Sequence, residues 1–196
     1  MKKSIRAYIP MYGFYTLFFI YLGTSSFQSR YFSEIGMTDT QIGLISSLPA
    51  IAALAAQPVW GMLSDRVKYK RTILLAGSAA AGLALIATGF LTGFLPVLIG
   101  MTVITVSLIC ITPTANSIAM EYSKNLMGPL RMTGTIGYQI GAVALGFILT
   151  ASLRGLMQIM GAILLLCALL SCFEPPIKGH QYGREKVSYI AVFQNK

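Results

Sequence analysis

A short basic stretch, Gly61-Met-Leu-Ser-Asp65-Arg66-Val-Lys68-Tyr-Lys70-Arg71, separates two long apolar stretches of the chain, residues 41–64 and 72–94. Each apolar stretch has about the 20 residues that an α-helix needs to cross a bilayer. Gly61 lacks a side chain and is expected to let two helices approach closely. The pattern therefore predicts two membrane-spanning helices joined by a charged loop.

Outward from this pair, four more apolar stretches of similar length follow the same pattern: 8–29, 96–122, 132–152 and 156–173. They are much longer than barrel strands and do not alternate apolar with polar residues, so strands are not expected. Hydrophobic residues make up 55% of the chain and charged residues only 11%, against about 25% charged in soluble domains. The sequence predicts an all-α membrane protein, with six transmembrane helices within residues 1–173 and a polar segment, 174–196, that is a cytoplasmic tail or the start of a central loop.

The basic residues indicate how this bundle is oriented. If the six spans alternate in direction, thirteen of the fifteen Lys and Arg residues fall on one side, and only Arg30 and Arg154 fall on the other. Such an excess marks the cytoplasmic side, so we expect a multi-pass protein of the cell inner (plasma) membrane with both termini in the cytoplasm. The thirteen are spread over four segments with no single basic stripe, which argues against nucleic-acid binding. They are Lys2, Lys3, Arg6, Arg66, Lys68, Lys70, Arg71, Lys124, Arg131, Lys178, Arg184, Lys186 and Lys196.

Two motifs carry a resemblance to a known family. The stretch from Gly61 to Arg71 resembles the loop signature of the major facilitator superfamily (MFS), and the preceding Gln57-Pro58-Val-Trp-Gly61 is similar to the form found in its lactose permease branch. The stretch Gly128-Pro-Leu-Arg131-Met-Thr-Gly134-Thr-Ile-Gly137-Tyr138 resembles a segment of the sugar and nucleoside symporters of that branch. The chain departs from the pattern at Lys68, where the signature usually has a second glycine.

The resemblance implies the N-terminal six-helix half of an MFS fold, built as a 3+3 inverted repeat. It implies a secondary active transporter that moves a small polar solute, such as a sugar or a nucleoside, by alternating access, with ion coupling. The expected partners are membrane lipid, the small-molecule solute, and either a missing C-terminal half or a second copy of the chain. The mildly apolar residues 187–193 are expected to lead into a seventh helix. The motif expected to gate the cytoplasmic side consists of Gly61, Asp65, Arg66, Lys70 and Arg71.

Helical spacing gives candidate substrate-binding residues. Thr105, Thr112 and Asn116 fall on one helical face, and so do Arg131, Thr135 and Tyr138. A third, mixed aromatic and polar stripe on the first span includes Tyr12. The alternative for the hydroxyl groups is ordinary packing, in which hydrogen bonds between helices contribute roughly 0.6 kcal/mol each.

The family resemblance adds information about individual candidates that helical spacing does not give. Arg131 either faces a cavity or extends to the membrane interface, and its match in the family contacts substrate. Tyr138 matches an aromatic residue that lies against a sugar ring. Asn116 stands where the lactose permease pattern has an acidic residue, so galactoside specificity is not supported. Gly137 and Gly141 are expected to mark a close helix contact.

The sequence holds no candidate catalytic residues. The one histidine, His180, lies beyond the last apolar stretch, and no membrane-depth cluster of His, Asp, Glu or Cys has the spacing of a metal site. Cys110, Cys167 and Cys172 all lie in apolar stretches and are expected to be reduced packing residues. We therefore expect no enzyme, cofactor or metal. The alternative to a transporter is a truncated facilitator, or a structural or regulatory membrane protein without transport of its own.

Overall fold

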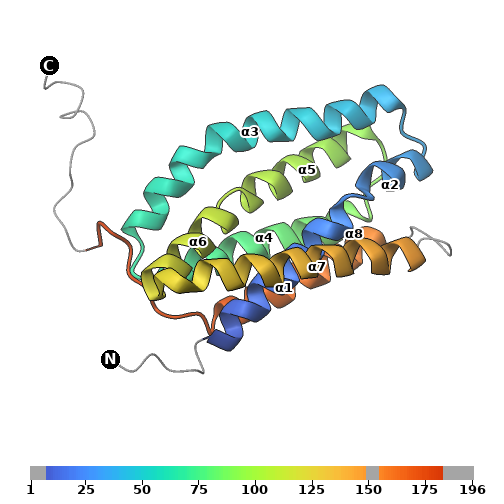
Figure 1. Cartoon of the computed structure of the whole chain (residues 1–196). Helices are drawn as coiled ribbons and strands as arrows, with labels where there is room; N and C mark the ends of the chain where they lie inside the picture. The colour runs from blue at the N-terminus through green and yellow to red at the C-terminus, as the bar shows by residue number, and fades with distance from the viewer. Residues whose placement is uncertain (1–7, 149–154, 183–196) are drawn as a thin grey trace, which may run out of the picture.

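The computed structural model describes residues 8–148 and 155–182, and within these ranges every regular element is a helix (Figure 1). The N-terminal basic residues, Arg154, and the chain beyond residue 182 lie outside the described part. The elements run in the order α1 (Tyr8–Ser25), α2 (Gln28–Glu34), α3 (Asp39–Arg66), α4 (Arg71–Thr88), α5 (Phe94–Leu108), α6 (Ile111–Tyr122), the 3-10 turn η2 (Lys124–Leu126), α7 (Met127–Ile148) and α8 (Leu156–Ser171).

Two of the six apolar stretches differ from single helices. The first forms α1, and the short α2 begins at its last two residues and continues to Glu34. The fourth divides into α5 and α6 at Ile109 and Cys110. The second break has a local cause in Pro113, which has no N–H to donate to the Ile109 carbonyl and whose ring crowds that carbonyl. The fifth predicted span corresponds to α7, which begins at Met127 and has Pro129 in its first turn, where proline is tolerated. Arg131 therefore lies inside α7.

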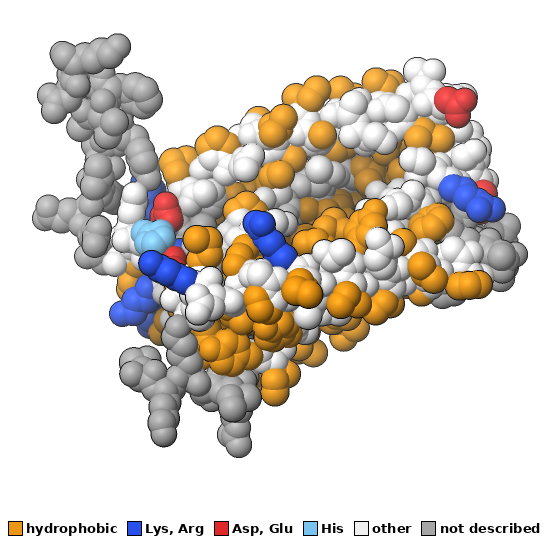
Figure 2. Space-filling view, in the orientation of Figure 1, with side chains coloured by type: hydrophobic (Ala, Val, Ile, Leu, Met, Phe, Trp, Pro, Cys, Tyr) orange, Lys and Arg blue, Asp and Glu red, His pale blue; other side chains and the backbone are white. Residues whose placement is uncertain are grey.

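Length and hydropathy identify three described helices that can cross a membrane. They are α3, α4 and the α5–α6 pair taken together as residues 94–122. The helix α8 is apolar but shorter, with 16 residues. Large apolar side chains project outward along α3 and α7, and Figure 2 shows hydrophobic atoms spread over the outside of the bundle. Water does not favour such a surface, whereas lipid or another apolar surface does.

Each long helix packs against particular neighbours. α1 lies against α7 and α8, α4 lies against α8, α5 and α6, and α3 lies against α5. The core between them is aromatic and aliphatic, with Phe14, Leu74, Ile104 and Leu164 each at most 1% exposed. Figure 1 shows α3 arching along one side of the bundle, away from α1 and α7. The helix contains Pro49 and Pro58, and interior prolines bend a helix.

The two ends of the bundle differ in character. At one end, Thr38 and Gln41 form a reciprocal capping box that starts α3: the Gln41 N–H donates to Thr38 Oγ1 and the Thr38 N–H donates to Gln41 Oε1. At the other end, the α3–α4 loop lies beside the segment that follows α8 (Figure 1). We call this second end the loop end.

Candidate functional site

A largely apolar cavity of about 500 Å³ that carries several amide and hydroxyl groups opens between α1, α3 and the α5–α6 pair. Figure 2 shows the face on which the bundle is hollowed, with charged side chains gathered mainly at its two ends. The residues that line this central cavity carry no formal charge: Phe18, Leu22, Gln57, Thr105, Leu108, Ile109, Thr112, Pro113 and Asn116. Two predicted binding residues, Thr112 and Asn116, thus lie together in one cavity.

The break between α5 and α6 forms part of the cavity wall. A straight helix would pair the Val106 carbonyl with the N–H of Cys110. Instead, the Trp60 indole N–H donates to the Val106 carbonyl oxygen at 2.8 Å. Ile109 and Pro113, on either side of the break, both line the cavity. Trp60, on α3, therefore satisfies a backbone group beside the break and ties α3 to this wall.

Asn116 is held in place from α1. The Tyr15 hydroxyl donates to Asn116 Oδ1 at 2.6 Å, joining residues 101 positions apart in the chain. Tyr15 is buried, with 5% of its surface exposed. The bond occupies the Asn116 carbonyl oxygen and leaves its NH₂ group, two donors, for other partners. Hydroxyl and carbonyl oxygens of a bound molecule can accept hydrogen bonds from these donors.

Two smaller cavities adjoin the central one. A loop-end cavity of about 210 Å³ shares Gln57, Ile109 and Pro113 with it and reaches Asp65 and Lys70. At the opposite end, a far-end cavity of about 310 Å³ shares Thr105 with the central cavity. Its polar lining is hydroxyl-rich: Ser25, Ser26, Gln28, Ser29, Ser46 and Thr105. The three cavities therefore follow one another along the length of the bundle.

The predicted residues of α7 do not line these cavities. Thr135 Oγ1 donates to the Arg131 carbonyl within its own helix at 3.0 Å. The Tyr138 hydroxyl lies 3.1 Å from Ser26 Oγ, a lining residue of the far-end cavity. Arg131 is exposed, and no described carboxylate lies within ion-pair distance of it. Of the α7 candidates, Arg131 acts electrostatically on the Tyr15 hydroxyl that donates to Asn116, whereas the Thr135 and Tyr138 hydroxyls have other contacts.

The first span packs closely against α7. A Cβ atom at Gly137 would lie 2.6 Å from the Thr16 carbonyl oxygen, and one at Gly141 would lie 2.3 Å from that of Ile20. A Cβ atom at Gly23 would meet the Tyr138 carbonyl oxygen at 2.2 Å. The prediction of a close helix contact at Gly137 and Gly141 is confirmed. Tyr12 is half-buried and packs against the hydrophobic core.

The predicted gating motif divides into buried and open parts. The Lys70 ammonium is buried, with 1% exposed, and forms an ion pair with Glu121 of α6. It also donates to Ser117 Oγ at 2.7 Å. The Arg71 guanidinium donates to the carbonyl oxygens of Cys172 and Glu174. These contacts tie the start of α4 to α6 and to the segment after α8.

The remaining motif residues lie at the surface of the loop end. Asp65 and Gly61 line the loop-end cavity, and Arg66 is exposed. The prediction that Gly61 allows a close helix approach is wrong, because a Cβ atom there would meet nothing within 4 Å. At this position α3 borders a cavity, so glycine adds open space to the cavity wall.

Sequence reasoning missed several partners that the fold brings to the site. Tyr15, Gln57, Trp60 and Glu121 were not singled out as site residues. Tyr15 and Asn116 are 101 residues apart, and Lys70 and Glu121 are 51 apart. One signal was present in the sequence, since Gln57 and Trp60 belong to the motif that precedes Gly61.

The central cavity offers chemistry suited to reversible binding. Its lining supplies amide and hydroxyl groups beside apolar and aromatic surface. Across the described ranges, no three His, Cys, Asp or Glu side chains come together as a metal site would require. Neutral donors and acceptors in a largely apolar cleft recognise small polar molecules. Fold and cavity thus define a helical membrane protein with a largely apolar cavity between its helices that carries a few uncharged polar groups.

Comparison with known proteins places the chain within that class. The model of the MFS_1 like family matches residues 8–187, and the chain belongs to this family of the major facilitator superfamily. It is 29% identical over 148 residues to an uncharacterized transporter, YwbF, of Bacillus subtilis (strain 168), covering 72% of this chain and 37% of that protein.

Two other relatives are also named as transport proteins. A putative tartrate transporter of Agrobacterium vitis is 29% identical over 190 residues, covering 87% of this chain and 41% of that protein. A maltose permease of Geobacillus stearothermophilus is 26% identical over 148 residues, covering 73% of this chain and 37% of that protein. The chain thus spans about two fifths of the length of these relatives. No solved structure gives a significant match.

Proposed function

We propose that this chain forms one half of a secondary transporter, a six-span bundle that moves a small polar solute such as a sugar or a nucleoside by alternating access. The observation that carries the proposal is the run of three adjoining cavities along the bundle. A transporter needs a polar path between helices, and each half supplies one wall of it. Transport proteins among the relatives support the same conclusion.

The packing of the helices supports the proposed 3+3 repeat. Taken as six spans, with α5–α6 as the fourth, the first span lies against the fifth and the second against the fourth. The third lies against both the fourth and the sixth, and the first lies against the sixth. Exchanging spans one to three with spans four to six reproduces the same set of neighbours. An internal repeat of two three-helix units accounts for this symmetry.

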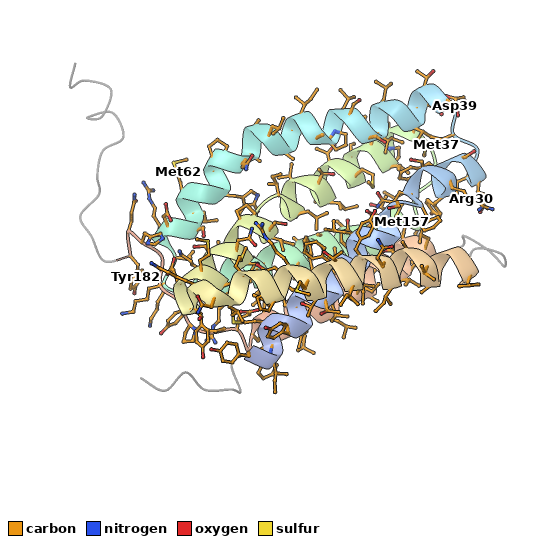
Figure 3. All side chains as sticks on the ribbon, in the orientation of Figure 1. Arg30, Met37, Asp39, Met62, Met157 and Tyr182 are labelled. Carbon is orange, nitrogen blue, oxygen red and sulfur yellow. The ribbon has the colours of Figure 1, made fainter. Side chains whose placement is uncertain are left out.

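The proposed orientation has the loop end in the cytoplasm of an inner-membrane protein. Basic residues of the described chain gather at this end: Arg66, Lys68, Lys70, Arg71, Lys124 and Lys178. The opposite end holds Arg30 and Asp39 (Figure 3), together with Glu34 at the end of α2. This asymmetry follows the rule that cytoplasmic loops carry the excess of Lys and Arg. Asp65 and its neighbours would then gate the cytoplasmic mouth of the path, and transport would be coupled to an ion.

Solute binding by the purified chain in detergent tests the proposal. The probes are maltose, uridine and tartrate, a neutral sugar, a nucleoside and a dianion. We expect maltose or uridine to raise the thermal midpoint and the dianion to have no effect, since the central cavity carries no positive charge. Asn116→Ala should abolish the shift, and Thr135→Ala, outside the cavity, should retain it. A shift that survives Asn116→Ala, or a response to tartrate alone, would contradict the proposed site.

A second candidate function concerns this chain acting by itself. A half-path is open on one side, so the chain alone would not transport unless a second copy or a separate half closed it. On this alternative, a truncated facilitator binds solute or a partner without transport of its own. Uptake of the bound probe into proteoliposomes separates the two. Uptake by the chain supports a dimerising half-transporter, whereas binding without uptake supports the truncated facilitator.

A further inference from the structure

The segment that follows α8, residues 174–182, crosses the α3–α4 loop, and we call it the strap. Three backbone hydrogen bonds join the two segments: Gln181 N–H to the Asp65 carbonyl at 2.9 Å, Gly179 N–H to the Val67 carbonyl at 3.1 Å, and Lys70 N–H to the Ile177 carbonyl at 2.8 Å. Their order shows that strap and loop run antiparallel. The strap is therefore docked on the predicted gating motif itself.

Docking satisfies the end of α3. The last carbonyl groups of a helix have no partner within the helix, and the strap supplies N–H donors to those of Asp65 and Val67. The approach is close enough to require glycine, because a Cβ atom at Gly179 would lie 2.3 Å from the Asp65 carbonyl oxygen. The strap thus fits the loop closely over several residues.

A buried carboxyl group anchors the start of the strap. Glu174 is 3% exposed, and its Oε2 atom is buried with no hydrogen-bond partner. The adjacent Arg71 guanidinium of α4 donates to the Glu174 backbone carbonyl at 3.2 Å. Burial raises the pKa of the Glu174 carboxyl from 4.5 to about 8. The strap therefore holds an acid group that is easier to bury with its proton than without.

The surroundings of Glu174 supply little to offset a negative charge. From α1, the Tyr15 hydroxyl interacts with it electrostatically, and Arg131 of α7 acts on that same hydroxyl. The helix α8 contains no charged residue. Elsewhere on the strap, His180 Nε2 lies 3.1 Å from Glu121 Oε1 of α6, and the Lys70 ammonium pairs with the same carboxylate. Arg71 is the described cation in direct contact with Glu174, through the backbone.

We propose that the strap is a pH-sensitive latch on the gating motif, docked while the Glu174 carboxyl holds a proton and released as that proton is lost. An uncompensated charge left in a buried site is strongly destabilising. Undocking returns the carboxylate to water and frees the α3–α4 loop. The consequence for gating rests on the proposed function, whereas the docking equilibrium itself can be measured without any solute.

The pH range follows from linkage. The docked carboxyl has a raised pKa, so docking is strongest at low pH. It weakens as pH rises from about 4.5 to about 8 and changes little above that. Within this range the docking constant falls roughly tenfold per pH unit. The latch is thus expected to respond across the neutral range.

Amide hydrogen exchange of the purified chain in detergent tests the latch. The readout is the protection factor of the Gly179 and Gln181 amides, corrected for intrinsic exchange at each pH. We expect protection to fall by a factor on the order of 10 to 100 between pH 6 and pH 8. Glu174→Gln should keep both amides protected at both pH values, because the amide side chain carries no charge. His180→Gln, which removes the imidazole of the strap, should leave the fall in place.

Several outcomes would overturn the latch. One is amide protection in the wild-type chain that does not change between pH 6 and pH 8. Another is a fall in protection in Glu174→Gln as large as that in the wild-type chain. If Glu174→Gln fails to fold, Gly179→Ala provides the second variant. Its added methyl group should expose the Gln181 amide at both pH values while the α8 amides stay protected. Persistent protection of Gln181 in Gly179→Ala would contradict the docking geometry. None of these results depends on transport.

Discussion

Replacing Glu121 by glutamine should strongly destabilise the loop end of the bundle. Glu121 is the carboxylate that neutralises the buried Lys70 ammonium. In Glu121→Gln the shape of the side chain is kept and only its charge is lost. The variant therefore tests whether the Lys70 charge depends on its partner, with little change in packing volume.

The size of the effect follows from the burial of the two partners. Breaking a fully buried ion pair typically costs about 3–5 kcal/mol, because the remaining charge is left uncompensated. Lys70 is 1% exposed but Glu121 is 31% exposed, so water already screens part of the interaction. Ser117 Oγ remains as an acceptor for the ammonium. We therefore expect a loss of about 2–3 kcal/mol in the free energy of unfolding, or a fall of roughly 5–10 °C in Tm.

The reaction of buried cysteines with a dye on heating measures the unfolding of each variant. Cys110 is 3% exposed and Cys167 is fully buried, so a thiol-reactive dye reports their release on heating. Cys172 is exposed and is replaced by serine in all variants. The double variant Lys70→Met/Glu121→Gln, which removes both charges, should recover most of the loss. A single variant within 0.5 kcal/mol of the wild-type chain, or a double variant no more stable than the single, would refute the reasoning.

Three further predictions concern packing and the cavity wall. Gly141→Ala should separate α1 from α7 and cost about 1–3 kcal/mol, whereas Gly146→Ala, with open space around it, should be neutral or stabilising. The same thiol assay decides, and equal effects would contradict the close contact. Tyr15→Phe should cost about 1–2 kcal/mol by leaving Asn116 Oδ1 without its donor, and should weaken binding of whichever probe the wild-type chain binds. The matched control Tyr12→Phe should do neither. Trp60→Phe should cost about 1–2 kcal/mol by freeing the Val106 carbonyl, and an unchanged midpoint would show that the indole N–H does not support the break.

The helical class of the fold could be predicted from the sequence because long apolar stretches have few structures open to them in a bilayer. Features that depend on single residues, such as the break between α5 and α6, were harder to predict. Pro113 signals a break, but the indole N–H that bonds the Val106 carbonyl beside it comes from Trp60 on α3. Local spacing carries no information about such a partner.

The candidate site was predictable in part for a similar reason. Spacing within one helix correctly put Thr112 and Asn116 on a common face. Spacing does not say which helix a face meets, so it did not indicate that α1 packs closely against α7 or that the Tyr138 hydroxyl lies beside Ser26. Glu174 lies just after Ser171, where a polar tail was expected, and its burial follows from tertiary packing that local spacing does not show.

Water access to Asn116 tests the central claim most directly, namely that a polar solute path runs through this bundle. The measurement is the reaction of Asn116→Cys, in a chain with its own cysteines replaced, with a small charged thiol reagent in membranes that contain the expressed chain. A water-filled path predicts fast reaction at residue 116. Ile118→Cys, buried at 1% exposure, and Val103→Cys, on the apolar surface of α5, should react slowly. Reaction at Asn116→Cys as slow as at those two positions would contradict the path.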